Sequence, residues 1–387
     1  MDLSKQMAFA FDEPIRMVDL HSQYVRLKDE IDKAVHEVLN NNNYINGPQV
    51  GEFAERFAKY MHVEHVIPCG NGTDAIQIAL MALNLQPGEE VIVPSFCYVA
   101  AAEAVALLGL KPVLVDVDSR TFNMDVEKVE QAISRMTKAI IPVHLFGQCC
   151  DMEPIMRIAR KYNLHVIEDN AQSVGACYIT SDESESVKAG TIGHIGTTSF
   201  FPSKPLACYG DGGALMTNDE TLAQRIRMIA NHGQEKKYYN KYIGCNSRLD
   251  TIQAAILKVK LKYLDQFTNA RVKVAKHYND AFKFLPYILL PHRPGYTTHV
   301  YHQYTIQVKN GKRNALQSYL KQKGIPSMIY YPLPIDRQEA FRVPARKAGM
   351  LEVSRKMSET VLSLPIHSEM TIDMQEYIED HIIRFFK

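Results

Sequence analysis

The 387-residue sequence predicts an α/β protein, with a mostly parallel sheet sandwiched by helices and a smaller C-terminal α+β domain. Three observations lead to this prediction. Between residues 64 and 218, short apolar runs alternate with amphipathic stretches. Polar residues rarely interrupt these runs, as is typical of strands buried on both faces of a parallel sheet. The chain is also too long for one ordinary core, which indicates a large and a small domain.

The apolar runs set the expected order of the first elements. Apolar residues recur every three to four positions from about residue 24 to residue 38, which predicts a helix, and residues 40–48 then break the pattern. Strands are expected at 90–94, 112–117, 139–143, 165–168, 197–201 and 214–217, and helices at 75–83, 98–108 and 152–162.

The second half of the chain is expected to be mainly helical. Asn218 is a plausible cap for a helix that ends near Asn231, and a tyrosine-rich loop then leads to Asn246. Apolar residues at helical spacing from Leu249 to Tyr263 predict a long helix. A strand is expected at 304–308, and helices at 270–283, at 313–322 and at the C-terminus. We therefore expect a large domain at residues 1–265 and a small one at 266–387.

Composition excludes several classes of protein. The formal charge of +1 offers no field for nucleic acid or an anionic membrane. No apolar run is long enough to span a bilayer, and Met1–Pro14 has no signal-peptide pattern. The seven cysteines are scattered without CxxC spacing, so free thiols in a cytoplasmic protein are expected. No metal site is predicted, because Cys149-Cys150 lacks a second ligand pair.

In parallel sheets, ligands bind beyond the carboxyl ends of the strands, so residues that follow the apolar runs are candidates for a site. In the segment Cys69–Ala75, two glycines and a Thr73-Asp74 cap precede a helical run. The free N–H groups and positive dipole end of such a helix suit a phosphate. The same pattern also fits a plain turn with a helix cap.

A second candidate is the strand that runs into Glu168-Asp169. It places a carboxylate at the same edge of the sheet, and a buried carboxylate needs a cation or a metal as partner. The alternative is that this pair only caps a helix.

The third candidate is Lys204, which follows Phe200 and Phe201 and precedes a glycine-rich loop. Pro205 biases the lysine toward an extended backbone. A lysine in such surroundings is expected to be desolvated, with its pKa lowered so that it acts as nucleophile and base. The alternative is a solvated surface charge. Together, a phosphate seat, a strand-end carboxylate and a desolvated lysine match the needs of a pyridoxal-phosphate (PLP) enzyme.

The chain resembles the DegT/DnrJ/StrS family of sugar aminotransferases, which adopts the aspartate-aminotransferase type of PLP fold. The matching stretches run through nearly the whole chain in family order: "NGTDAIQIAL", "VIVPSFCYVA", "IIPVHLFGQ", "VIEDNAQSVGA", "TSFFPSK", "YGDGGAL", "NHGQ", "NSRLDTIQAAIL" and "YYPLP".

The resemblance implies roles for residues around the cofactor ring. Lys204 would be the Schiff-base lysine and the carrier of protons, and Asp169 would pair with the pyridinium nitrogen. Gln172 would lie near the 3-hydroxyl group, and Tyr98 would stack on the ring face.

The resemblance also implies a phosphate site and a homodimer. Gly72, Thr73 and Ser199 would hold the phosphate, and Asn246 would reach it from the other subunit. Arg248 lies in the same segment and would clamp the carboxylate of a uronate substrate. Alternatively, Arg248 caps the long helix or pairs with Asp250.

The motifs look most like those of members that aminate C3 of UDP-2-acetamido-2-deoxy-3-oxo-glucuronate for cell-surface polysaccharides such as lipopolysaccharide, with glutamate as the amino donor. Tyr330 and Tyr331 would contact this substrate. Three departures from the family pattern leave the sugar open, and a keto-6-deoxy nucleotide sugar is the alternative. The departures are Pro205 in place of Asn, Tyr330 in place of His, and Asp336 in place of His or Asn.

Three other functions are weighed against this one. A sugar dehydratase of the same fold typically has histidine in place of Lys204, and a nicotinamide enzyme would need a GxGxxG turn that "CGNGTD" does not supply. The third is a non-catalytic regulator that retains the fold. Of the nearby histidines, His144 is expected to be structural, and His299 and His302 are expected to face solvent.

Overall fold

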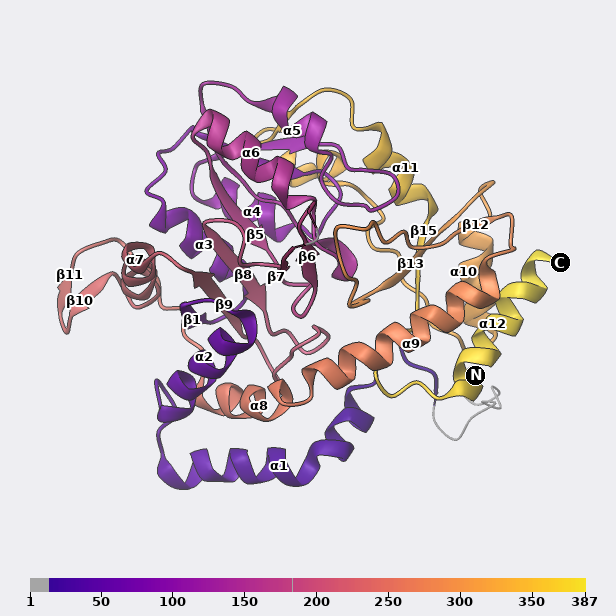
Figure 1. Ribbon diagram of the computed structural model, residues 1–387, viewed down its shortest axis with the longest axis horizontal. Helices are drawn as coiled ribbons and strands as arrows, with labels where there is room; N and C mark the ends of the chain where they lie inside the picture. The colour runs from indigo at the N-terminus through magenta and orange to yellow at the C-terminus, as the bar shows by residue number, and fades with distance from the viewer. Residues whose placement is uncertain (1–13, 183) are drawn as a thin grey trace.

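The computed structural model describes residues 14–182 and 184–387. An eight-stranded sheet forms its centre, in the order β1-β9-β8-β5-β4-β2-β3-β14 (Figure 1). Only β9 runs against the other seven strands. The strands are β1 (His65–Cys69), β2 (Glu90–Pro94), β3 (Lys111–Val115), β4 (Thr137–Ile140), β5 (His165–Asp169), β8 (Ile195–Ser199), β9 (Gly213–Thr217) and β14 (Arg346–Lys347). The predicted α/β class is confirmed, and so are the six strands predicted between residues 90 and 217.

Helices cover both faces of this sheet, because alternate residues of its strands point to two separate cores. One core contains Ile67 and Leu215 with apolar residues of α3 (Gly72–Ala82), α4 (Ala100–Leu107) and α7 (Glu220–Ala230). The opposite face packs on α5 (Val126–Ala132) and α6 (Met152–Tyr162) at one end. At its other end, this face packs on α2 (Pro48–Met61) and α8 (Thr251–Leu261). In turn, α1 (Leu20–Asn41) packs on α8.

The C-terminal part forms its own core around a three-stranded antiparallel sheet, β12-β13-β15. The helix α9 begins at Leu264, earlier than predicted, and runs from α8 to this unit (Figure 1). The elements here are α9 (Leu264–Phe282), β12 (Ile288–Leu289), β13 (Tyr304–Val308), α10 (Arg313–Gln322), α11 (Glu352–Thr360), β15 (Val361–Leu364) and α12 (Ile372–Phe386). The boundary at residue 265 stays a prediction.

One C-terminal segment returns to the large sheet. The strand β14 pairs in parallel with β3, and Ile335 and Phe341 belong to the core of the large sheet. The Arg346 guanidinium donates two hydrogen bonds of 2.9 Å to the Glu90 carboxylate. The last strand of the large sheet therefore comes from a point more than 200 residues further along the chain than its neighbour.

Smaller features complete the fold. Two hairpins are formed by β6 (Cys177–Ile179) with β7 (Ser186–Lys188), and by β10 (Gln234–Lys236) with β11 (Tyr239–Asn240). The prediction that Asn218 caps α7 is wrong, because the cap is Asp219, whose carboxylate accepts the Leu222 N–H. Asn218 instead accepts a hydrogen bond from the Glu64 N–H. Across the described ranges, no helix combines the length and apolar character that a membrane crossing needs.

Candidate active site

The sheet topology brings the predicted site segments to one edge. Since β1, β5 and β8 run in the same direction, the segments that follow Cys69, Asp169 and Ser199 leave the sheet on the same side. The glycine-rich start of β9 lies there too, because β9 is antiparallel to β1 and β8. This edge therefore collects the lysine, the carboxylate and the helix N-terminus that the sequence singled out.

Lys204 is partly buried, Asp169 is buried, and the charges of the two side chains interact. Burial lowers the pKa of Lys204, and the Asp169 carboxylate opposes that effect. Burial raises the pKa of Asp169, which is 7% exposed, while the Ala171 N–H and the charge of Lys204 act in the other direction. The Ala171 N–H donates to Asp169 Oδ1 at 3.1 Å. The arrangement supplies a desolvated amine facing a fixed carboxylate.

The helix α3 begins at Gly72 in close contact with β8. Its cap is Asn71, whose side chain accepts the Asp74 N–H at 2.8 Å, and the predicted Thr73-Asp74 cap is therefore wrong. A Cβ atom on Gly72 would stand 2.7 Å from Ser199 Cβ. The N–H groups of Gly72 and Thr73 lie in the first turn, where a helix provides no intrahelical acceptor. These donors suit an anion.

Ser247 joins the Asn246–Arg248 segment to this helix start within one chain. Its hydroxyl accepts the Gly70 N–H at 2.9 Å and donates to Asp74 Oδ2 at 2.6 Å. Ser247 was not predicted from the sequence. The only indication of its role was its position between Asn246 and Arg248, which were both predicted site residues. Asn246 is exposed and Arg248 is partly exposed. Among the described residues, no ion pair joins Arg248 to Asp250.

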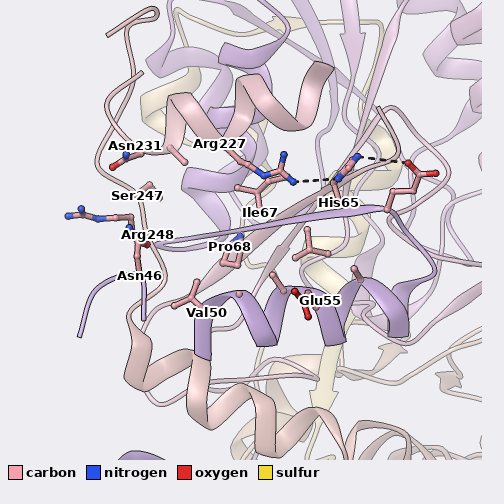
Figure 2. A pocket seen from close by; sticks show the side chains of 16 residues that line it. Asn46, Val50, Glu55, His65, Ile67, Pro68, Arg227, Asn231, Ser247 and Arg248 are labelled. Carbon is pink, nitrogen blue, oxygen red and sulfur yellow. Dashed lines mark hydrogen bonds and ion pairs between the residues drawn. The ribbon is translucent and has the colours of Figure 1, made fainter. Parts of the chain in front are cut away.

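A cavity of about 450 Å³ lies beside this segment, between α2, β1 and the end of α7. Figure 2 shows that the Arg248 side chain points away from the cavity, while Arg227 and His65 lie at its far end. Neither Lys204 nor Asp169 lines it. The cavity is therefore separate from the edge that holds the lysine.

Gln172 links the sheet edge to the C-terminal part. Its Oε1 accepts the Phe146 N–H at 2.8 Å, and its Nε2 donates to the Tyr331 hydroxyl at 3.1 Å. The Tyr331 ring lies 6.3 Å from the ring of Tyr98, which is 56% exposed. Tyr330 is partly buried beside it, with ring centroids 5.9 Å apart. The predicted residues Gln172, Tyr98, Tyr330 and Tyr331 are thus neighbours.

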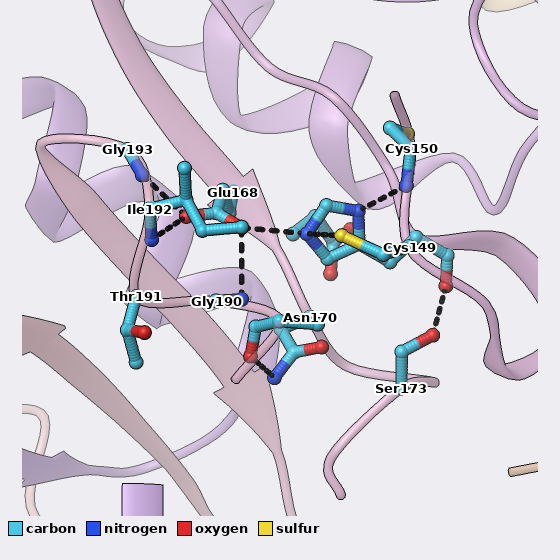
Figure 3. Close-up of polar contacts among 12 residues, drawn as sticks. Cys149, Cys150, Glu168, Asn170, Ser173, Gly190, Thr191, Ile192 and Gly193 are labelled. Carbon is cyan, nitrogen blue, oxygen red and sulfur yellow. Dashed lines mark hydrogen bonds and ion pairs between the residues drawn. The ribbon is translucent and has the colours of Figure 1, made fainter. Parts of the chain in front are cut away.

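His144, His299 and His302 are all buried. His144 is fully buried, and its ring bonds to Glu168 and to the Cys150 N–H, two residues that Figure 3 labels. The prediction that His299 and His302 face solvent is wrong, since they are 5% and 4% exposed. These histidines are buried because their loop packs against residues 146–148. The packing is so close that a Cβ on Gly147 would stand 2.8 Å from the backbone nitrogen of His302.

The sequence matches those of known proteins over most of its length. The model of the DegT/DnrJ/EryC1/StrS aminotransferase family matches residues 25–383. A UDP-2-acetamido-2-deoxy-3-oxo-D-glucuronate aminotransferase of Pseudomonas aeruginosa is 47% identical, over 91% of this chain and 95% of its own. A protein of Geobacillus stearothermophilus named pleiotropic regulatory protein is 43% identical, over 96% of this chain and 99% of its own.

Solved structures share the fold. A DegT DnrJ EryC1 StrS aminotransferase from Brucella abortus has a TM-score of 0.91 and 42% identity, covering 96% of this chain and 99% of its own. The structure of ntda from Bacillus subtilis with bound cofactor PMP has a TM-score of 0.84 and 30% identity, covering 99% of this chain and 86% of its own.

Proposed function

Since the chain belongs to the DegT/DnrJ/EryC1/StrS aminotransferase family, we propose that it binds PLP and moves an amino group from L-glutamate to a nucleotide-linked keto-sugar. The substrate we propose is UDP-2-acetamido-2-deoxy-3-oxo-glucuronate, aminated at C3, as the name of the P. aeruginosa relative states for that protein. The observation that carries the proposal is the sheet edge that brings together the desolvated Lys204, the buried Asp169 carboxylate and the N-terminus of α3.

The residues at this edge fit PLP in three ways. Gly72 lets the start of α3 approach Ser199 closely, and the free N–H groups at this helix start favour an anion. The lowered pKa of Lys204 increases its share of neutral amine, the form that bonds to an aldehyde. The buried Asp169 carboxylate suits a protonated ring nitrogen.

When bound, PLP supplies an aldehyde that takes up amines and a ring that accepts electrons when a proton leaves the substrate. Lys204 Nζ would hold the cofactor at its aldehyde carbon. Once the amino group of glutamate has displaced it, the free lysine amine would take the proton from the glutamate carbon that bears nitrogen and later deliver a proton to the sugar carbon. Asp169 would keep the proton on the ring nitrogen. Gln172 would hold the ring near its hydroxyl group, and Tyr98 would cover the ring face.

The phosphate site is completed by a second copy of the chain. In the proposal, Gly72, Thr73 and Ser199 hold the phosphate, and Asn246 of a neighbouring subunit adds a further donor. Two features support a homodimer. Asn246 is exposed, and it follows a hairpin that projects from the body beyond α7 (Figure 1). The hairpin segment carries exposed apolar side chains, which mark interaction surfaces: Tyr238, Tyr239 and Ile243.

We propose that Arg248 enters the same neighbouring site and clamps the uronate carboxylate, with Tyr330 and Tyr331 against the sugar nucleotide. A guanidinium can bind a carboxylate with two parallel hydrogen bonds. Arg248 is partly exposed and forms no ion pair with an acidic side chain among the described residues, so its guanidinium is available to bind a substrate carboxylate. A cytoplasmic location is proposed as well, because all seven cysteines are free.

A second candidate, a regulator that keeps the fold without the chemistry, is favoured by the name of the G. stearothermophilus relative. Absorbance separates the two. The proposed enzyme is yellow with PLP, and its colour bleaches when glutamate is added. A panel of keto-sugar nucleotides then identifies the acceptor, because only the true acceptor restores the colour. A protein that takes up no PLP would be the regulator, and recovery only with 6-deoxy keto-sugars would overturn the uronate assignment.

A further inference from the structure

On the face of β5 opposite to Asp169, the Glu168 carboxylate is fully buried. It accepts four hydrogen bonds, and Figure 3 shows Glu168 with its donors Gly190, Ile192 and Gly193. Its Oε2 accepts from His144 Nε2 at 2.7 Å and from the Gly190 N–H at 2.8 Å. Its Oε1 accepts from the N–H groups of Ile192 and Gly193 at 2.6 and 2.5 Å. The described residues place no lysine or arginine against it, so these donors alone stabilise the carboxylate.

His144 connects this carboxylate to Asp169. Its Nδ1 accepts the Cys150 N–H at 3.1 Å, so the ring proton lies on Nε2 and points to Glu168. The backbone N–H of His144 donates to the Asp169 carbonyl at 3.0 Å, and the Asp169 N–H donates to the Pro142 carbonyl at 2.9 Å. One residue therefore holds Glu168 by its ring and Asp169 by its main chain.

The residue types in this cluster could also bind a metal ion. Ligand atoms of His144, Cys149 and Glu168 lie within 4.8 Å of one another. Both ring nitrogens are already in hydrogen bonds, and each carboxylate oxygen accepts two. Burial also raises the pKa of the Cys149 thiol to about 12, which keeps it protonated. A metal would have to break several buried hydrogen bonds at once, which disfavours it.

We propose that His144 and Glu168 are positioning residues that fix Asp169 against the ring nitrogen of the bound cofactor. The proposal rests on the function proposed above. Successive side chains of a strand point to opposite faces, so Asp169 faces the Lys204 side while Glu168 faces the 190–193 loop. The ring of His144 fixes the end of β5 from behind, and this sets how closely the Asp169 carboxylate approaches the cofactor.

A matched pair of variants separates positioning from simple stability. In His144→Asn, the amide oxygen can still accept the Cys150 N–H, but no donor reaches Glu168. In His144→Gln, the longer amide can still donate to Glu168, but the acceptor for Cys150 is lost. Each variant removes one of the two ring hydrogen bonds, so the two are expected to lose similar stability.

The measurements are the ¹⁵N chemical shift of the ring nitrogen in ¹⁵N-labelled PLP and the dissociation constant of PLP. We expect the shift to move toward the unprotonated value in His144→Asn, with affinity weakened about tenfold. His144→Gln should retain the wild-type shift. Glu168→Gln is expected to change the shift and the affinity as His144→Asn does, because the new NH₂ group would face N–H donors. Glu168→Gln therefore replaces His144→Asn in the test if His144→Asn does not fold.

A second measurement needs no variant. In wild-type protein with ¹⁵N-labelled histidine, Nε2 of His144 should carry a proton and Nδ1 should not. Equal falls in thermal stability with an unchanged ring-nitrogen shift in every variant would overturn the positioning role. Stoichiometric zinc in the purified wild type would also overturn it. If the wild type itself takes up no PLP, the proposed function fails first, which is a distinguishable outcome.

Discussion

Gly72 and Ser199 come from segments more than 120 residues apart, yet a Cβ on Gly72 would stand 2.7 Å from Ser199 Cβ. This contact joins the start of α3 to the end of β8. It explains why glycine is needed at position 72, where the backbone does not require a positive φ.

Gly72→Ala is therefore expected to lower both thermal stability and PLP affinity. The added methyl group must push β8 and α3 apart, at a cost of about 1–3 kcal/mol for overpacking. Absorbance titration with PLP and thermal unfolding measure the two effects. Gly51→Ala in α2 is the control, because its Cβ would meet nothing within 4 Å, and alanine gains up to about 1 kcal/mol in a helix. Wild-type PLP affinity in Gly72→Ala would show that the contact plays no part in the cofactor site.

Lys204→Ala is expected to abolish the yellow cofactor band and to reduce turnover by about 10²–10⁴-fold or more. The variant loses both the amine that bonds to the aldehyde and the group that carries the proton. Steady-state assays and absorbance spectra measure these losses. The exposed Lys161→Ala serves as the control for a lost surface charge. Retained steady-state turnover in Lys204→Ala would refute the assignment.

Arg248→Lys is expected to reduce the preference for a uronate acceptor. Lysine keeps the charge but loses the two-bond geometry, at a cost of about 1.5–3 kcal/mol for a charged hydrogen bond left unmade. The ratio of kcat/KM for uronate and 6-deoxy keto-sugars, measured with both proteins, isolates this effect from overall stability. An unchanged ratio would leave Arg248 with a structural role only.

Glu379 is expected to make the protein less stable as pH rises from about 5 to 7. Burial and the nearby Glu376 raise the pKa of Glu379 to about 7. His277 Nε2 lies 3.3 Å from Glu379 Oε2. The folded state therefore binds more protons than the unfolded state in this window, so stability falls as pH rises through it. Solvent screening limits the effect to about 1 kcal/mol.

Glu379→Gln should remove this part of the pH dependence, measured as the difference in unfolding free energy from the wild type between pH 5 and 8. Glu376→Gln is the companion variant. Without the repulsion from Glu376, the transition should move to lower pH while its sign stays the same. Parallel pH profiles for the wild type and Glu379→Gln would contradict the assignment.

The large sheet could be predicted because its strands are buried on both faces, which leaves unbroken apolar runs such as Val91–Val93. Because the strands are parallel, their carboxyl ends share one edge of the sheet, and Asp169 and Lys204 are therefore expected at that same edge. The helix α2 was not predicted, since Gly47-Pro48 indicated only a break. The structure uses Pro48 as the first residue of that helix, a position that favours proline.

Long-range contacts account for two further differences between the prediction and the structure. The burial of His302 depends on a loop that packs against Gly147, and nothing in the local pattern of residues 299–303 indicates that partner. Ser247 bonds to Gly70 across 177 residues, and a lone serine carries no periodic signal. Such pairings follow from topology, which local sequence patterns do not encode.

The pairing of β14 with β3 has a consequence for synthesis of the protein. Ribosomes make the chain from the N-terminus, so β3 is complete more than 200 residues before Arg346 and Lys347 emerge. Until then, β3 presents an unpaired strand edge that can recruit strands from other nascent chains. Chains that end before residue 346 are therefore expected to aggregate, although they contain Lys204, Asp169 and the start of α3.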